Sequence, residues 1–403
     1  MEVKNSFKII AATGLVVGNL IGAGILALPI SLGLVGVIPS LVAMLLYSSM
    51  MLFTANVLAK ESGEAKNVNF DYPSLYEHYL GKWGKWAAVA TNAIILYGLL
   101  IAYISGGTQI IADLFGISGT PIYVALVLSF ILIILTIMDL SVINKYNTVL
   151  IGGLFIAFAG LIILSFPGIS VSRLAESHWK YFGLTIPLVV TASHFHNIIP
   201  TLCKDLEWDV KALKKAMLFG MIAAVIMNML WTICGIGCLE RIGENGLLNA
   251  YINNLPATVP MSKVLNSQTF TILAVIFSMV AISTSFLANG LGLMSFVRDL
   301  LYNTFKIDKQ YLVRLITFAP PVIIAVIWPE IFIKALNVVG GIGIVTLFGI
   351  LPCLISILKK DNSLKYKFFG VFFLILSIAA LIIVIGMLCN ISIFNPNPQA
   401  ELA

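Results

Sequence analysis

The sequence predicts an all-α integral membrane protein with eleven transmembrane helices. Of its 403 residues, 60% are apolar and only 10% are charged, and the mean hydropathy is +1.02. Soluble domains carry about 25% charged residues and fewer than half apolar ones. The excess apolar surface therefore requires lipid, and the composition excludes an ordinary water-soluble fold.

The placement of the charges divides the chain into spans. No Asp, Glu, Lys or Arg occurs between Lys8 and Lys60, and further charge-free stretches follow along the chain. A helix needs roughly 20 apolar residues to cross about 30 Å of hydrocarbon, so the first stretch holds two helices and each later one about one. The expected spans are 9–34, 38–59, 86–112, 120–138, 147–166, 183–203, 213–238, 269–296, 312–328, 332–357 and 367–391.

The basic residues predict the orientation of these spans. If the N-terminus lies in the cytoplasm, 19 of the 24 Lys and Arg residues fall in cytoplasmic segments. Short loops rich in Lys and Arg stay inside, so we expect a multi-pass protein of the cytoplasmic (inner) membrane with its N-terminus inside and its C-terminus outside. The formal net charge of +6 then reflects basic residues beside lipid headgroups. Membrane lipids are the expected partner, and a nucleic acid is not.

The first expected helix, 9–34, contains a break. A stripe of small residues that lets another helix approach closely explains part of its glycine content. Packing alone does not explain Asn19, Pro29 and the Gly22–Gly24 segment in one span. These glycines weaken the helix where no water can satisfy the freed backbone groups. We therefore expect an unwound stretch that lines a cavity or binds a ligand.

The sixth expected helix, 183–203, contains a second irregularity between Thr191 and Thr201. Its polar members are Ser193, His194, His196 and Asn197. Neighbouring residues in a helix face different directions, so they cannot all contact one partner surface. Polar residues inside a membrane are costly and usually mark a site. A polar packing contact or a cytoplasmic helix end is the alternative.

The two breaks, marked by Pro29 and Pro200, each open a run of five spans. Interrupted helices in corresponding positions of two halves are typical of the central site of a secondary transporter. Because five is odd, the second half starts on the opposite side of the membrane and the repeats must be inverted. We expect the repeats at 7–166 and 183–358, with 367–391 as an extra helix.

The eighth expected helix carries a third polar group. Thr284 and Ser285 offer two hydroxyls and Asn289 offers an amide within one charge-free span. Such groups can supply oxygen ligands for a hard cation. Ser and Thr also bond back to their own helix, so this motif alone does not establish a site.

Together these motifs resemble the hydroxy and aromatic amino acid permeases, the bacterial tyrosine and tryptophan transporter group of the amino acid-polyamine-organocation superfamily. The residues that carry the resemblance are Gly22–Pro29, Ala102–Gly106, the Phe195-His196 pair followed by Pro200, and Ser285–Leu287 with Gly290 and Gly292. It implies a LeuT-type fold with a 5+5 inverted repeat, broken helices 1 and 6, and an eleventh helix, forming a single transmembrane transporter domain over 1–403. It also implies uptake of an amino acid by symport with a cation.

The resemblance and the breaks together suggest a binding site. Free amides near the helix 1 break can bind the carboxylate of an amino acid, and unpaired carbonyls can receive its ammonium. An aromatic substrate, tyrosine or tryptophan, is expected, and serine or threonine is the alternative. The family's aromatic carriers usually have Gly where this chain has His194. The expected substrate-binding residues are Asn19, Gly22, Ala23, Gly24, Tyr103, Ser193, His194, Phe195, His196 and Asn197.

The coupling ion can be sodium or a proton. The spans hold no Asp, Glu, Lys or Arg near the midplane, so only His194 and His196 could carry a proton there. The resemblance to sodium-coupled LeuT-type carriers favours sodium, because that site needs only neutral oxygens. The expected sodium ligands are Gly18, Ile21, Ala281, Thr284 and Ser285. Some proton-coupled relatives place a lysine there, and Lys145 lies near the start of helix 5. We expect no cofactor.

A channel and a membrane-embedded enzyme are the alternative classes. A channel usually shows a continuous polar pore lining or a repeated filter motif, and neither is visible. The spans contain no HExxH motif and no paired intramembrane Asp, and two histidines at i and i+2 are a weak basis for a metal site. We therefore expect no catalytic residue and no metal site apart from sodium. The oligomeric state stays open.

Overall fold

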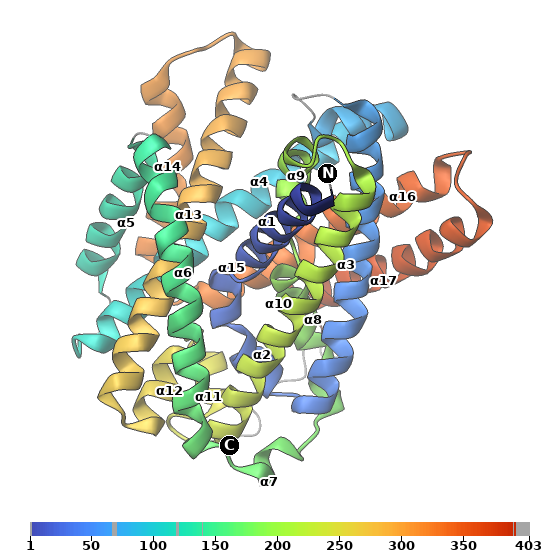
Figure 1. The fold of residues 1–403 in the computed structure, drawn as a ribbon. Helices are drawn as coiled ribbons and strands as arrows, with labels where there is room; N and C mark the ends of the chain where they lie inside the picture. Colours follow the sequence, from blue (N-terminus) through green and yellow to red (C-terminus); the bar gives the residue numbers. More distant parts are fainter. Residues whose placement is uncertain (1, 67–70, 118–120, 139, 390, 392–403) are drawn as a thin grey trace.

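A computed structural model describes residues 2–66, 71–117, 121–138, 140–389 and 391, and within these residues the structure is helical without a strand (Figure 1). Side chains are described except at 2–5, 23, 140–151 and 303–305. The longer helices are α1 (Glu2–Leu20), α3 (Val37–Ala65), α4 (Tyr72–Leu114), α5 (Ile122–Ile137), α6 (Leu140–Ser165), α8 (Phe182–Ala192), α10 (Val210–Cys238), α13 (Gln268–Phe305), α14 (Gln310–Ile327) and α17 (Leu364–Leu388). The shorter ones are α2 (Leu28–Gly33), α7 (Val171–Leu174), α9 (Ile199–Asp205), α11 (Leu247–Ile252), α12 (Thr258–Leu265), α15 (Phe332–Val338) and α16 (Leu351–Leu358).

Helices occupy the positions that the charge-free stretches predicted. Eight spans among the described residues are long and apolar enough to cross a membrane, and α1 with α2, bent by 50° at a short break, makes a ninth. Shorter apolar helices lie at Ile122–Ile137 and Gly152–Gly168. Helix α5, with 16 residues, is about 24 Å long, less than the ~30 Å of the hydrocarbon layer. The multi-spanning architecture is confirmed, and the count of eleven spans stays a prediction.

One connection differs from expectation. The sequence predicts a span that starts at 86, whereas α4 already begins at Tyr72. The Asp71 side chain caps this helix by accepting a hydrogen bond from the Ser74 amide at 2.8 Å. Gly81 bends it with φ of +68°, a conformation that glycine adopts without strain. Polar and aromatic residues before Gly81 therefore form a helical segment of their own, which hydropathy alone cannot detect.

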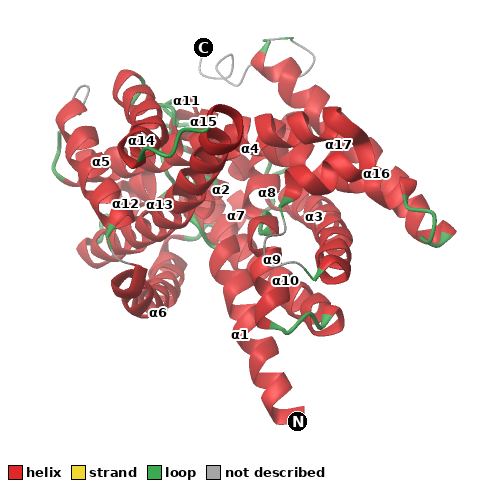
Figure 2. Cartoon of the chain, turned by 90° about the horizontal axis from the view of Figure 1, so that it is seen from above, coloured by secondary structure: helices red, strands yellow, loops and turns green. Residues whose placement is uncertain are grey.

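The helices form two groups around a central pair. In Figures 1 and 2, α5, α6, α13 and α14 lie on one side and α3, α16 and α17 on the other. Helices α1 and α8 lie between them, and α1 packs against α10. A Cβ on Gly235 of α10 would lie 2.3 Å from the Cβ of Pro29, which shows how closely α10 approaches the first interrupted span. The interrupted helices are thus held at the centre of the molecule.

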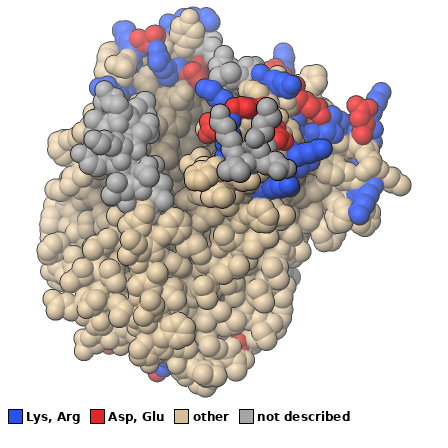
Figure 3. Space-filling view, in the orientation of Figure 1, with Lys and Arg blue, Asp and Glu red and all other residues tan. Residues whose placement is uncertain are grey.

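Charges gather at one end of the molecule. Figure 3 shows most Lys and Arg of this face at the end where Figure 1 places the N-terminus, above a broad belt with almost no charge. Ion pairs at that end include Lys8 with Glu207 at 2.5 Å and Lys359 with Glu61 at 2.7 Å. The uncharged belt is the surface that a hydrocarbon layer requires. We refer to the end with the N-terminus as the basic end.

Candidate functional site

The first interrupted span is broken between α1 and α2. Gly22 has extended backbone, with φ of −95° and ψ of −164°, and a short 3-10 turn, η1 (Ala23–Leu26), follows it. Within the described residues, the amides of Gly22 and Gly24 donate to no backbone carbonyl, and the carbonyls of residues 18–21 accept from no backbone amide. The predicted break is confirmed. The break leaves unpaired amide donors at Gly22 and Gly24 and unpaired carbonyl acceptors at residues 18–21.

The second interrupted span is broken between α8 and α9. Helix α8 ends at Ala192, and a 3-10 turn, η4 (His196–Ile198), leads into α9. Pro200 lies in the first turn of α9, where its missing amide costs no helical hydrogen bond. Among described residues, the carbonyls of 192–194 receive no backbone hydrogen bond. This predicted break is also confirmed.

The two breaks and α13 meet at one place. A Cβ built on Gly24 would lie 3.7 Å from the Thr191 Cγ2 and 4.0 Å from the Ala192 Cα. A Cβ on Gly22 would lie 2.9 Å from the Ser285 Oγ. Any larger side chain at Gly22 would therefore displace Ser285, so the bare backbone allows α1 and α13 to touch at the break.

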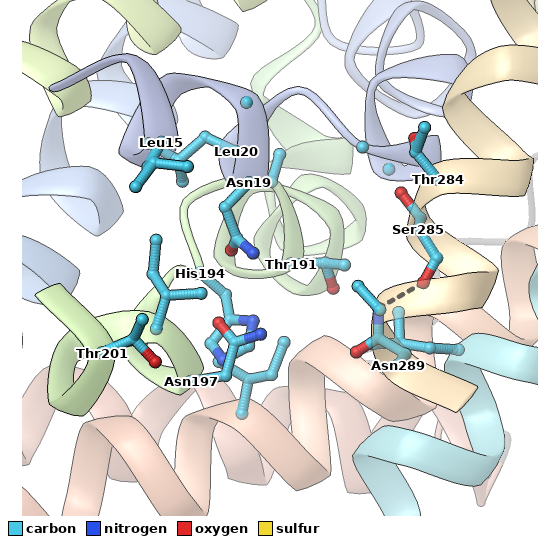
Figure 4. Close-up of a pocket in the computed structure, with 18 of the residues that line it drawn as sticks. Leu15, Asn19, Leu20, Thr191, His194, Asn197, Thr201, Thr284, Ser285 and Asn289 are labelled. Atoms are coloured by element: carbon cyan, nitrogen blue, oxygen red, sulfur yellow. Dashed lines mark hydrogen bonds between the residues drawn. The ribbon is translucent and has the colours of Figure 1, made fainter. Parts of the chain in front are cut away.

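A cavity of about 230 Å³ lies beside these breaks. Six of the predicted substrate-binding residues line it: Asn19, Gly22, Gly24, Tyr103, His194 and Asn197. Three of the predicted ion ligands also line it: Gly18, Thr284 and Ser285. In Figure 4, Asn19 points toward His194 and Asn197, whereas Thr284, Ser285 and Asn289 lie together on the other side of the cavity.

Other predicted residues lie away from the cavity. Ser193 is buried and bonds the Ser48 hydroxyl on α3 at 2.8 Å. His196 is buried, with its Nε2 3.0 Å from the Thr54 Oγ1, and its carbonyl accepts from the Tyr72 hydroxyl. Phe195 is fully buried. These three side chains therefore hold the broken span against its neighbours instead of facing the cavity.

Three predicted residues, Ile21, Ala23 and Ala281, are not among the residues that line the cavity. The side chains of Ile21 and Ala281 are buried. The Ala281 carbonyl accepts a hydrogen bond from the Thr284 hydroxyl at 3.2 Å, and the Val280 carbonyl accepts another at 2.8 Å. The side chain of Ala23 lies outside the described part of the structure. The ion ligands predicted for Ile21 and Ala281 are carbonyl oxygens, so burial of their side chains does not conflict with that role.

Asn289 and Tyr103 join two helices at the cavity wall. The Asn289 amide donates to the Ser285 carbonyl at 2.9 Å and to the Tyr103 hydroxyl at 3.3 Å. These bonds leave the Asn289 side-chain carbonyl oxygen without a partner of its own among the described residues. The wall formed by α4 and α13 is thus ordered and still offers an acceptor.

Several lining residues were missed. Thr191 and Thr201 lie at the ends of the polar run around the second break, so the sequence contained a signal for them. Leu15, Leu20, Leu99, Ile198, Leu202, Ala288 and Ile344 line the cavity as well. No sequence signal could single them out, because apolar residues that face a cavity and those that face lipid have the same composition.

The cavity lies on the basic-end side of the breaks. It is lined there by Gly14 and Leu15 of α1 and by Thr201 and Leu202 of α9. On the opposite side, α2 is fully buried. The Ala257 amide donates to the Leu26 carbonyl at 2.7 Å, which places the connection between α11 and α12 against η1. Access to the breaks is therefore asymmetric.

Two interrupted helices that border a central cavity, in a bundle of apolar helices, define a membrane transport protein of the multi-spanning class. The comparisons with known proteins agree. The tryptophan/tyrosine permease family matches residues 5–392, and the chain belongs to this family. It is accordingly a multi-pass permease of the inner membrane and not an enzyme.

The relatives and the solved structures that resemble the chain cover most of it. A "Tyrosine-specific transport system 1" from Haemophilus influenzae is 32% identical over 83% of this chain and 84% of its own length. A "Tryptophan-specific transport protein" from the same organism is 26% identical over 92% of this chain and 93% of its own length. A manganese transporter from Eremococcus coleocola has a similar fold, with a TM-score of 0.63 and 16% identity over 97% of this chain and 89% of its own.

Proposed function

We propose that the protein is a secondary active transporter that imports an aromatic L-amino acid, tyrosine or tryptophan, by alternating access between the inverted repeats 7–166 and 183–358 of a LeuT-type fold. The relatives named for tyrosine and tryptophan support this substrate class. One structural observation carries the proposal. The unpaired backbone groups of both broken spans border a single cavity that α13 completes.

This arrangement suits the two charged groups of an amino acid. The free amides of Gly22 and Gly24 bind the carboxylate, since unpaired N–H groups at a helix break attract an anion. The free carbonyls at 192–194 receive the ammonium. When the site closes around the substrate and excludes water, both sets of bonds become stronger than in bulk water. The Tyr103 hydroxyl and the Asn289 amide support the carboxylate side from α4 and α13.

Sodium is the coupling ion we favour. The Gly18 and Ile21 carbonyls have no backbone donor within the described residues, and the Ser285 hydroxyl lies directly against Gly22. Five or six neutral oxygens of this kind can hold the ion without a fixed charge. A proton carried by His194 and His196, whose ring centroids lie 5.8 Å apart, is the alternative. The side chain of Lys145 lies outside the described residues.

The cavity size and its closed side argue against the alternative substrates and against a channel. Pockets for drug-sized ligands measure about 300–1,000 Å³, so a cavity of about 230 Å³ suits one small metabolite. Serine or threonine would leave more of this space empty than an aromatic amino acid. The closed side at α2 argues against a continuously open channel. Because the cavity opens toward the basic end, we assign this conformation as inward-facing, with the N-terminus in the cytoplasm.

A binding screen tests the substrate class. Purified protein is heated with each of the twenty amino acids, with sodium and with choline in its place. A ligand at 100 times its Kd stabilises the folded state by about 2.7 kcal/mol. We expect tyrosine or tryptophan to raise the midpoint of unfolding, and to do so more strongly in sodium. Stabilisation by serine and threonine alone would favour the alternative substrate, and stabilisation by no amino acid would contradict the proposal.

A further inference from the structure

His194 differs from the other polar residues of the cavity. Its ring lines the cavity, yet its Nε2 is buried and has no hydrogen-bond partner in the described structure. Thr191, by contrast, donates to the Pro187 carbonyl at 2.9 Å, and Thr284 donates to its own helix. A buried polar atom without a partner is unfavourable unless a ligand supplies one. This imidazole therefore has hydrogen-bonding capacity that the protein itself does not use.

The plane of the His194 ring is fixed by stacking. It lies against Phe348 with ring centroids 4.9 Å apart and parallel to the His196 ring at 5.8 Å with an interplanar angle of 5°. His196 is held in turn by Thr54. A half-turn about Cβ–Cγ exchanges Nε2 with Cε1 without changing this plane. The ring can thus offer a nitrogen to the cavity while its stack stays intact.

The location of His194 assigns it to the side chain of a substrate. Gly22 lies next to Ser285, and Gly24 lies next to Thr191. His194 and Asn197 lie together on the side of the cavity opposite Ser285 (Figure 4). If the carboxylate binds at the break, the ring of an aromatic amino acid extends toward His194. The apolar side chains of Leu15 and Leu20 flank this region.

We propose that His194 is the residue that selects a hydroxylated aromatic ring, so that the transporter prefers tyrosine to phenylalanine. This rests on the proposed function and narrows it. Neutral imidazole has one donor and one acceptor nitrogen. A phenol can satisfy either of them because it both donates and accepts, whereas an indole N–H only donates. Phenylalanine would leave the His194 nitrogen unpaired in a closed site, and such a loss discriminates strongly between substrates.

Competition in proteoliposomes tests the assignment. The concentrations of unlabelled tyrosine and phenylalanine that halve the uptake of labelled tyrosine are compared in the wild type, His194→Phe and His194→Gln. Phe keeps the ring stack and removes the nitrogens, and Gln keeps hydrogen bonding. Exposed His78, which lies outside the cavity, provides the matched control His78→Phe. The ratio of the two concentrations does not depend on how much protein is active.

We expect the wild type to prefer tyrosine by about fivefold or more, because leaving a buried polar group unpaired costs about 1–3 kcal/mol and each 1.4 kcal/mol is about tenfold in affinity. The preference should approach one in His194→Phe and persist in His194→Gln and His78→Phe. An unchanged preference in His194→Phe would overturn the assignment. Equal affinity of the wild type for both amino acids would also overturn it, even if His194→Phe does not fold, and would leave the proposed function standing. Absence of binding of any aromatic amino acid would overturn both.

Discussion

At the scale of single residues, the site depends on two glycines at the first helix break. Gly22 brings its backbone against Ser285, and Gly24 brings its backbone against Thr191 and Ala192. The Gly22 contact requires glycine, because a Cβ there would lie 2.9 Å from the Ser285 Oγ. Both glycines have amides with no helical partner. The chemistry at the centre of this uncharged bundle therefore comes from backbone groups, hydroxyls, amides and the His194 imidazole.

The ion assignment is tested at Thr284 and Ser285. Replacing both by Ala removes two hydroxyl ligands and should raise the sodium concentration for half-maximal uptake about tenfold for each ~1.4 kcal/mol of lost affinity. Thr271→Ala, on the same helix and outside the cavity, is the control and should leave this concentration unchanged. Uptake that does not depend on sodium but is abolished by a protonophore would contradict the assignment. It would favour coupling to a proton carried by His194 and His196.

Some of the polar residues predicted for the site face the cavity, and others do not. Asn19, His194 and Asn197 were predicted because polar groups inside a membrane are costly and usually mark a site. All three line the cavity. Ser193 and His196 belong to the same polar run but bond to α3. In an irregular segment no helical period fixes the direction of each side chain. The sequence can therefore identify the run but cannot say which of its members face the cavity.

At the scale of elements, the start of α4 connects several segments. Tyr76 donates its hydroxyl to the Leu347 carbonyl at 2.7 Å, and Tyr79 donates to Glu61 at 2.8 Å. Leu347 belongs to η5 (Val339–Ile350), a π-helical segment between α15 and α16. π-helical turns are frequent at functional sites. The tyrosines of one short helix thus tie α3, the second break and the π-helical segment together.

A related network ties α3 to the end of α16. The Lys359 ammonium donates to Glu61 at 2.7 Å and to Glu64 at 2.6 Å. Burial by itself lowers the pKa of Lys359, but these two carboxylates outweigh it and raise the pKa above its ordinary value. Lys359 therefore stays charged, and the ion pairs persist at neutral pH.

The Tyr76 bond is tested by removing one oxygen. Tyr76→Phe leaves the Leu347 carbonyl without its donor in a fully buried position and should cost about 1–3 kcal/mol of stability. Tyr311→Phe, at a tyrosine that is 67% exposed, is the matched control and should cost little. Thermal unfolding in detergent measures both. Equal midpoints for the two variants would show that the start of α4 does not contribute to stability in this way.

The long helices and the two helix breaks were predictable from the sequence, whereas two other features were not. The charge-free stretches located the spans because lipid excludes charges whatever the fold. The breaks at Gly22 and Ser193 were predictable because Gly, Pro and polar residues gather there. The start of α4 at Tyr72 and the π-helical segment were not, because both depend on tertiary contacts and neither changes the local hydropathy.

At the scale of the whole molecule, the basic residues and the cavity both indicate which end faces the cytoplasm. Lys and Arg gather at the basic end, and the cavity lies on the same side of the breaks. Movement of the closed region around α2 would give access from the other side. Such alternating access distinguishes a carrier from a channel.

Counterflow in proteoliposomes tests this central claim most directly. Vesicles that contain the protein are loaded with unlabelled tyrosine and diluted into a trace of labelled tyrosine. A carrier should accumulate label transiently above its equilibrium level, saturably, and empty vesicles should not. Sodium on both sides should accelerate the exchange. Equilibration of label without any overshoot, at a rate that rises linearly with concentration, would contradict the account and indicate a channel.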